Sequence, residues 1–404
     1  MKKTIKIILI TLLSLIALIT ITIAVLFAVF KDDITSAVEP NFVTLTPITE
    51  DLDSIALTTN KEMPDSIRRN LEDYDYLVSF VEENYAPFSA IMEKGYEQEY
   101  RAMRKQLRQQ VIYGEADIEK AAIDYILWFF SRFDRHISVH TETFWKIANT
   151  LFPKNIEIIE YAPKAVSCKV DSCTWLIRVP SCDQGLEEQI SKAFHQFVES
   201  DCKNLIIDVR GNPGGSDGVW NNYYAALYDH PSKPFICWFR NTPENLPYWE
   251  RALETYPTSE YMKRFIERCK SSKKNFEIWV EKDGDMGLRS TERIHRAAVL
   301  IDWKTGSAAE SLVEFVKKHC DRAKVYGICN TNGSDLTGNI NLVSLPNSKI
   351  EFQYPTTVDS DFYDNDFSGT PGISPDIIIP LPYPKILTDN IDEWVLWVAE
   401  DLKR

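Results

Sequence analysis

The stretch AAVLIDWKTGSAAESLVEF, residues 297–315, constrains the fold most, because it joins a strand pattern to a helix pattern through one short turn. Residues 297–301 are all apolar, which is typical of a buried strand. After a polar turn, Ser307 begins a helical pattern. A serine at such a turn lies at the exposed end of a sheet, beside unpaired N–H groups that can bind a developing oxyanion. The pattern therefore predicts a nucleophile.

The same residues also fit a purely structural role. Ser307 and Glu310 have the spacing S-x-x-E of a capping box, in which both side chains satisfy the first donors of a helix. Many helices begin in this way without any chemistry. This segment alone leaves both interpretations open.

Further segments indicate an α/β protein. Short apolar stretches at 173–180, 205–209, 235–239 and 323–328 are typical of strands, and residues 186–198 have the pattern of an amphipathic helix. Alternating strands and helices predict a core with a mostly parallel sheet. The predicted organisation, in chain order, is a membrane anchor (1–33), a tether (34–61), an N-terminal helical subdomain (62–150), an α/β core (151–385) with an inserted segment (216–295), and a C-terminal helix (386–404).

The amino-terminal segment has the features of a membrane anchor. Lys2, Lys3 and Lys6 precede Ile7–Phe30, which contains no charge. At about 1.5 Å per residue, this run is long enough to cross a hydrocarbon core of about 30 Å. Lysines in front favour a cytoplasmic N-terminus, so we expect the rest of the chain outside the cytoplasm, at the cell surface or in the periplasm. A cleaved signal peptide, with a shorter apolar run, is the alternative.

Charge and cysteine spacing exclude two other classes. The net charge of -14 argues against a nucleic-acid partner, since phosphate binding needs clustered Lys and Arg. The eight cysteines include no Cys-x-x-Cys and no zinc-type spacing. We predict neither a metal nor an organic cofactor.

Three motifs in order resemble a known family. LIIDVRGNPGG (residues 205–215), LIDWKTGSAAES (300–311) and GISPDIII (372–379) are similar to those of the tail-specific, or C-terminal processing, serine peptidases. The resemblance implies a core of the crotonase-like ββα type with Ser307 as nucleophile. It also implies an oxyanion hole formed by Gly214 or Gly215 together with the N–H of Ala308. Peptides or unfolded proteins are the substrates that this family implies.

The base is predicted by comparing the two branches of the family. One branch has a lysine in a turn that corresponds to residues 327–335, which here contain none. The other branch, similar to the tricorn core, has a histidine after the helical region, and His136 matches that position. An imidazole titrates near neutrality and can accept the serine proton. His136 is therefore the predicted base, with His140 as second choice.

The third member of a triad is a carboxylate that orients the histidine. The tricorn-like pattern places it shortly before Gly372, where aspartates crowd the sequence. We predict Asp366, and Glu351 and Asp361 remain open. Glu310 is interpreted as a capping or pocket-shaping residue.

One part of the family pattern is missing. Only about thirty residues separate His140 from the strand at 173–180, which is too few for the peptide-binding PDZ domain of C-terminal processing peptidases. The inserted segment, rich in Trp and Tyr, either covers the site or packs as ordinary core. We expect a membrane-anchored serine endopeptidase, and the alternative is a non-catalytic ligand- or peptide-binding protein on the same fold.

Overall fold

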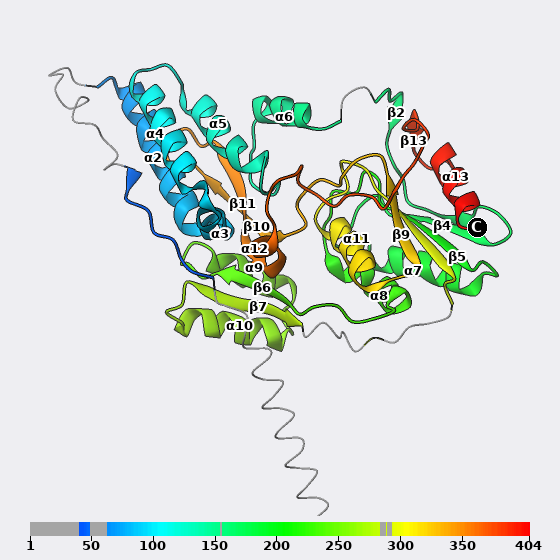
Figure 1. Ribbon diagram of the computed structural model, residues 1–404. Coiled ribbons are helices and arrows are strands. Elements are labelled where there is room, and N and C mark those ends of the chain that lie inside the picture. The colour runs from blue at the N-terminus through cyan, green and yellow to red at the C-terminus, as the bar shows by residue number, and fades with distance from the viewer. Residues whose placement is uncertain (1–39, 49–62, 154–155, 283–287, 289–292) are drawn as a thin grey trace, which may run out of the picture. The chain divides into compact units, whose positions relative to one another are not determined.

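The structure is a computed structural model that describes residues 40–48, 63–153, 156–282, 288 and 293–404 (Figure 1). The chain divides into two compact units, residues 1–40 and 41–404, and the architecture below is that of the second. The predicted membrane anchor at 1–33 lies outside the described residues. Among the described helices, none has both the length and the hydrophobicity that crossing a bilayer requires.

A six-stranded sheet forms the centre of the α/β core. Its neighbouring strands are parallel, except that β3 and β4 are antiparallel. Four of the strands coincide with the apolar stretches predicted from the sequence. In spatial order the strands are β12 (Ile377–Ile378), β9 (Ala323–Gly327), β8 (Arg296–Leu300), β5 (Asn204–Asp208), β4 (Thr174–Arg178) and β3 (Val166–Lys169).

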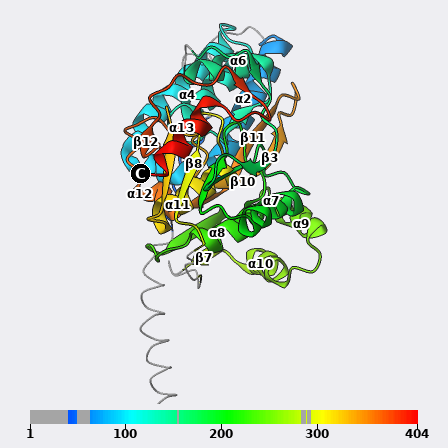
Figure 2. The same cartoon turned by 90° about the vertical axis from the view of Figure 1, so that its right-hand side faces the viewer.

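Helices cover both faces of this sheet, which explains why the middles of its central strands β5 and β8 are apolar on both sides. Ile207 and Val299 face one side and belong to a core with α7 (Glu187–Glu199), α8 (Asn221–Leu227) and α11 (Ala308–His319). Ile206 and Leu300, one residue along, face the other side and pack with α13 (Glu393–Asp401). Helices α7 and α8 lie side by side (Figure 2).

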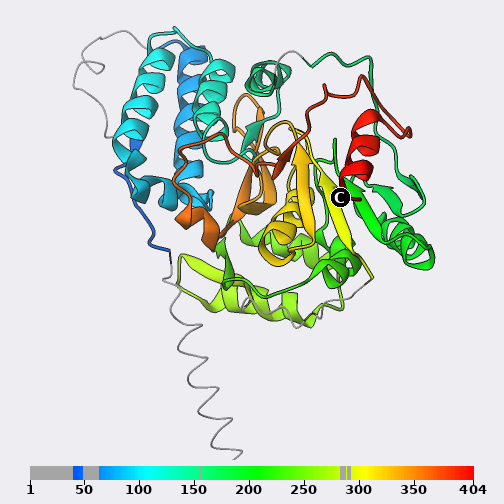
Figure 3. The same cartoon turned by 45° about the vertical axis from the view of Figure 1, so that its right-hand side comes forward.

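A second sheet of five strands is antiparallel. Strand β11 pairs with β10 along one edge and with β1 and β6 along the other, and β6 pairs with β7. Figure 3 shows its orange strands between the blue and cyan helices and the yellow strands of the first sheet. The five strands are β1 (Ser138–Val139), β6 (Phe235–Arg240), β7 (Phe276–Lys282), β10 (Thr337–Ser344) and β11 (Glu351–Asp359).

Two helical layers pack against the second sheet. One core joins Phe352 and Tyr354 to the N-terminal helices. A separate core joins Phe239 to α9 (Leu246–Thr255) and α10 (Glu260–Ser271). The N-terminal helices are α2 (Asp65–Asn84), α3 (Phe88–Ile91), α4 (Glu97–Ile112) and α5 (Ile118–Phe130). Other short elements are α6 (Glu142–Ala148), α12 (Ser360–Asp364), β2 (Glu160–Tyr161) and β13 (Ile386–Leu387).

The segment predicted as an insertion is part of this second sheet. Residues 216–295 contain β6 and β7, which β11 continues into a single sheet. Strand β10 has the sequence TGNINLVS, whose glycine and asparagines are poor strand formers, so propensity gave no sign of it. The fold of the segment predicted as an insert is therefore completed by a strand distant in sequence.

Four buried charged side chains join the first sheet to the last helix. Arg178 Nε donates to Asp208 Oδ2 at 2.7 Å, and Arg210 Nη2 donates to both Asp208 and Asp392 at 2.7 Å. Asp392 also caps α13, where its Oδ1 accepts from Trp394 N–H at 3.0 Å. The two arginines lower the pKa of Asp208, which therefore stays ionised in spite of its burial. This network fixes the strand ends that precede the glycine-rich loop.

Replacing Asp392 with alanine removes the cap and leaves two arginines with one carboxylate. Removing one partner of a buried ion pair costs about 3–5 kcal/mol, so we expect a loss of that size in the free energy of unfolding, measured by urea titration. Glu157→Ala is the control, because Glu157 pairs with Lys385 while both are exposed, and it should change stability by less than about 1 kcal/mol. Equal effects of the two substitutions would contradict a structural role for the buried network.

Candidate active site

Ser307 occupies a strained turn between β8 and α11. Its backbone has φ 50° and ψ -122°, outside the regions that a residue with a Cβ ordinarily adopts. Such strain persists only where the surrounding structure enforces it, and it occurs in the strand–turn–helix elbows that expose a nucleophile. The serine side chain lines a cavity of about 540 Å³.

Asp302 holds the turn before the serine. Its Oδ1 accepts from the N–H groups of Lys304 and Thr305 at 2.9 and 3.1 Å, which closes the turn on itself. The same carboxylate accepts from Gly211 N–H at 3.1 Å and from the hydroxyl of Tyr383 at 2.8 Å. The serine turn and the glycine-rich loop are thus fixed to one buried carboxylate.

The glycine-rich loop lies directly against Ser307. Gly214 has φ 106°, and a Cβ there would come within 2.6 Å of the Ser307 Cβ. Gly215 has φ 135°, and a Cβ there would come within 2.2 Å of the Cys182 carbonyl oxygen. Only glycine fits at both positions. The sequence motif therefore reflects a close backbone approach to the serine.

The two glycines differ in their N–H groups. Gly214 N–H donates to Asn212 Oδ1 at 2.9 Å, so it is already engaged. Gly215 and Ala308 both line the cavity with Ser307. Ala308 is the first residue of α11, where a helix leaves its N–H groups without an intrahelical acceptor. Of the predicted oxyanion donors, the geometry favours Gly215 and Ala308 over Gly214.

Glu310 is buried, and its carboxylate bonds the serine turn to a second loop. Its Oε2 accepts from the N–H groups of Ser307 and Ser334, each at 2.9 Å, and from the Ser334 hydroxyl at 2.7 Å. Its Oε1 accepts from Gly333 N–H at 2.7 Å and from the Thr331 hydroxyl at 2.5 Å. The glutamate contact of the predicted capping box is therefore formed, and it extends to the segment 331–337, here called the bridging loop.

The bridging loop also contacts the segment that contains His136. Arg135 N–H donates to the Gly333 carbonyl at 3.1 Å, and Arg135 Nη1 donates to the Asn332 carbonyl at 2.8 Å. The His136 ring contacts Thr337, with 2.8 Å between Nδ1 and Oγ1. Thr337 lines the same cavity as Ser307. Segments about 170 residues apart thus meet through this loop.

A short chain of hydrogen bonds fixes the tautomer of His136. The single hydroxyl hydrogen of Thr337 is donated to Asp134 Oδ1 at 2.8 Å. Thr337 Oγ1 can then only accept from the imidazole, which places the proton on Nδ1 and leaves the lone pair on Nε2. Burial lowers the pKa of His136 to about 4, so the ring is neutral at physiological pH.

Asp134, rather than Asp366, is the carboxylate beside the histidine. Its Oδ1 accepts from His136 N–H at 2.9 Å, and it lies 3.8 Å from Nδ1. Burial raises its pKa to about 6. Asp366 is exposed and accepts from Ser368, whose N–H lowers its pKa. The contacts therefore favour Asp134 over the predicted Asp366, because an aspartate's proximity to a motif in sequence does not place it near the imidazole.

The other candidate residues also lie elsewhere. His140 is exposed, and its Nε2 contacts Gln353 Oε1 at 2.9 Å. Asp361 pairs with Lys318 and Lys233. Glu351 is exposed on β11, where its carbonyl accepts from His140 N–H at 2.8 Å.

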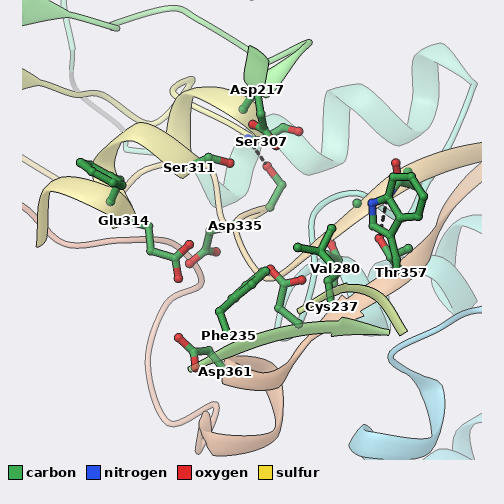
Figure 4. Close-up of a pocket in the computed structure, with 18 of the residues that line it drawn as sticks. Asp217, Phe235, Cys237, Val280, Ser307, Ser311, Glu314, Asp335, Thr357 and Asp361 are labelled. Carbon is green, nitrogen blue, oxygen red and sulfur yellow. Dashed lines mark hydrogen bonds between the residues drawn. The ribbon is translucent and has the colours of Figure 1, made fainter. Parts of the chain in front are cut away.

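The cavity beside Ser307 lies between the two sheets. Ser307, Ser311 and Glu314 come from the start of α11, and Phe235, Cys237 and Val280 face them from β6 and β7 (Figure 4). Burial and the neighbouring Glu314 raise the pKa of Asp359 in its wall to about 8. In the described part of the chain, no three acidic, histidine or cysteine side chains form a metal site. All eight cysteines are free thiols.

A strained serine at a strand–helix turn, beside a glycine loop and helix N–H groups, defines a serine hydrolase of the acyl-transfer type. The family model of peptidase family S41 matches residues 174–379, just over half of the chain. The chain therefore belongs to peptidase family S41 and is a serine peptidase.

Solved structures share this fold at low sequence identity. Mature CPAF is 14% identical with a TM-score of 0.53, and the match covers 84% of this chain and 96% of that chain. Mature CPAF complexed with lactacystin is 13% identical with a TM-score of 0.50, covering 73% and 90%. A lipoprotein from Streptococcus agalactiae is 16% identical, covering 86% and 99%, but its TM-score of 0.42 is too low to show a shared fold. No curated protein sequence matches this chain.

Replacing Glu310 with glutamine tests its role in holding the bridging loop. The amide nitrogen of glutamine would face N–H and O–H groups whose hydrogen bonds the carboxylate now accepts. Each buried donor left without an acceptor costs about 1–3 kcal/mol. We expect the free energy of unfolding to fall by about 2–4 kcal/mol, with faster amide exchange at Gly333 and Ser334.

Glu314→Gln is the matched control, one turn further along α11. Glu314 pairs with Lys318 on the same helix and does not contact the bridging loop through a hydrogen bond in the described chain, so its replacement should leave the exchange of Gly333 and Ser334 unchanged. If Glu310→Gln left the exchange of Gly333 and Ser334 unchanged, the carboxylate would not be what holds the loop.

Proposed function

We propose that this chain is an endopeptidase that cleaves peptide or unfolded-protein substrates with Ser307 as nucleophile. The observation that carries the proposal is the strained Ser307 turn, which opens into a cavity shared with Gly215 and Ala308. Ser307 Oγ attacks the scissile carbonyl, and the N–H groups of Gly215 and Ala308 stabilise the oxyanion. The glycine-rich loop lies close enough to Ser307 for its backbone N–H groups to stabilise the oxyanion of an acyl-transfer reaction.

His136 is the proposed general base. Its Nε2 takes the proton from Ser307 and returns it to the leaving amine, and water then repeats the cycle on the acyl-enzyme. Thr337 and Asp134 hold the ring in the tautomer that this transfer needs. The support is that Thr337, which bonds the ring, also lines the cavity of Ser307. Asp134 acts on the imidazole through the threonine hydroxyl.

We further propose that a single transmembrane helix anchors the chain and that the peptidase domain acts outside the cytoplasm. The uncharged run Ile7–Phe30, preceded by three lysines, supports this location.

Replacing Ser307 with alanine should abolish hydrolysis of casein, while the melting temperature stays within a few degrees of the unmodified protein. Ser311→Ala is the control, because Ser311 lines the same cavity one turn along α11. It should retain most of the activity. If the unmodified protein cleaves no peptide under any condition, the fold serves ligand binding instead.

The pH dependence tests the histidine and its partner. Above about pH 6 Asp134 is ionised and accepts the Thr337 hydroxyl hydrogen strongly, and below it the neutral carboxyl is a weaker acceptor and can donate to Thr337 instead. We therefore expect kcat/KM to fall as the pH drops through about 6. Asp134→Asn should lower kcat/KM and remove this limb, leaving a decline near pH 4 as His136 is protonated. A limb near pH 6 that persists in Asp134→Asn would contradict the assignment.

A further inference from the structure

Strand β10 has one unpartnered edge. In the described chain it pairs with β11 alone. Its residues 338–340 line the cavity of Ser307, and residues 339–342 line an adjoining groove of about 970 Å³. Ser344 is exposed and belongs to neither lining. The free edge of β10 thus extends from the cavity of the proposed nucleophile into the adjoining groove.

The hydrogen bonds of β11 show which backbone groups of β10 face this edge. The carbonyls of Glu351 and Pro355 accept from His140 N–H and Ala86 N–H, so they point away from β10. Alternate residues of a strand direct their backbone groups to the same edge. The β10 residues paired with Glu351, Gln353 and Pro355 therefore turn their own N–H and C=O groups outward. These residues are Ser344, Leu342 and Ile340.

Two details support this assignment. Pro355, opposite Ile340, has no N–H and therefore cannot donate to it. Leu342 N–H bonds the side chain of the preceding Asn341 at 3.1 Å instead of β11. The Asn341 side chain is held in turn by Arg251 Nη2 at 2.9 Å. An outward N–H at Leu342 thus has a local acceptor that an incoming carbonyl can replace.

We propose that the substrate binds as an added strand along the outward edge of β10, with Ile340 and Leu342 exchanging backbone hydrogen bonds with an extended segment of unfolded protein. The proposal rests on the proposed peptidase function and names the form in which its substrate is recognised. Strand addition uses main-chain groups that every peptide carries, so it tolerates many sequences. Residues 338–342 span about 17 Å, which matches five extended residues.

The position of the edge favours a substrate over a second copy of this chain. Ser307 and Gly338 line one cavity, so a peptide bound along β10 would extend into the cavity of the proposed nucleophile. Asn339, at φ 55°, interrupts the regular strand beside that cavity. A kinked edge suits a short peptide better than a long sheet continued between two copies.

The test measures binding in the Ser307→Ala background, so that cleavage is not needed. Fluorescein-labelled casein peptides are titrated by fluorescence anisotropy, and the tightest binder is resynthesised with single N-methyl groups along its backbone. A single N-methyl group removes one backbone N–H donor, and the loss of one hydrogen bond of about 1 kcal/mol should raise the Kd about fivefold. We expect this rise at every second residue over the bound stretch.

Leu342→Pro and Ser344→Pro form a matched pair of protein variants. Both replace an outward N–H on the same exposed strand, and only Leu342 lines the groove. Leu342→Pro should raise the Kd about tenfold, and Ser344→Pro should change it less than about twofold, with equal melting temperatures.

Three results would overturn the proposal. The two proline variants could raise the Kd equally, N-methyl groups could raise the Kd without alternation along the peptide, or no casein peptide could bind. A dimer that Leu342→Pro alone dissociates, with no effect on peptide binding, would also overturn it in favour of a second copy. If the Kd of the Ser307→Ala variant rises at every second N-methylated residue but the unmodified protein hydrolyses no peptide, the peptidase function is refuted and strand addition is supported.

Discussion

The carboxylate of Glu310 is the interaction on which the rest of the site depends. It accepts from Ser307 N–H on one side and from residues of the bridging loop on the other. Burial raises its pKa, whereas the hydrogen bonds that it accepts favour the ionised form. Because the same loop carries Thr337, the position of the imidazole is tied to that of the serine. A residue of the helix start therefore aligns two segments that belong to different sheets.

This arrangement places the chemistry where the two sheets meet. The first sheet provides the rigid strand and helix that strain Ser307, and the second provides His136 and the open edge of β10. Covered on both faces, the first sheet has little freedom to relax the turn. The second sheet leaves an edge accessible in the groove. Rigidity at the proposed nucleophile and accessibility at the proposed binding edge are the properties that cleaving an extended chain requires.

The local features of the core were predictable from sequence, and the long-range ones were not. The strand before Ser307 is marked by an apolar run of residues. The glycine-rich loop is marked by glycines that allow a close approach of the backbone. The hydrogen bond between Thr337 and Asp134 joins residues 203 positions apart, and no local sequence pattern predicts such a contact. Strand β10 was missed because its polar sequence depends on β11 for its conformation. Asp366 was chosen for its place in a motif, whereas burial and hydrogen bonding select Asp134.

The central claim is that Ser307 and the imidazole of His136 act together at one scissile bond. A peptidyl chloromethyl ketone tests it directly, since such a reagent alkylates the imidazole only after the serine has added to its ketone. Mass spectrometry of the treated protein should find one adduct, on His136, and none in Ser307→Ala. If Ser307 reacted with a fluorophosphonate while the ketone labelled no histidine, or labelled His140, the two segments would not form one catalytic centre.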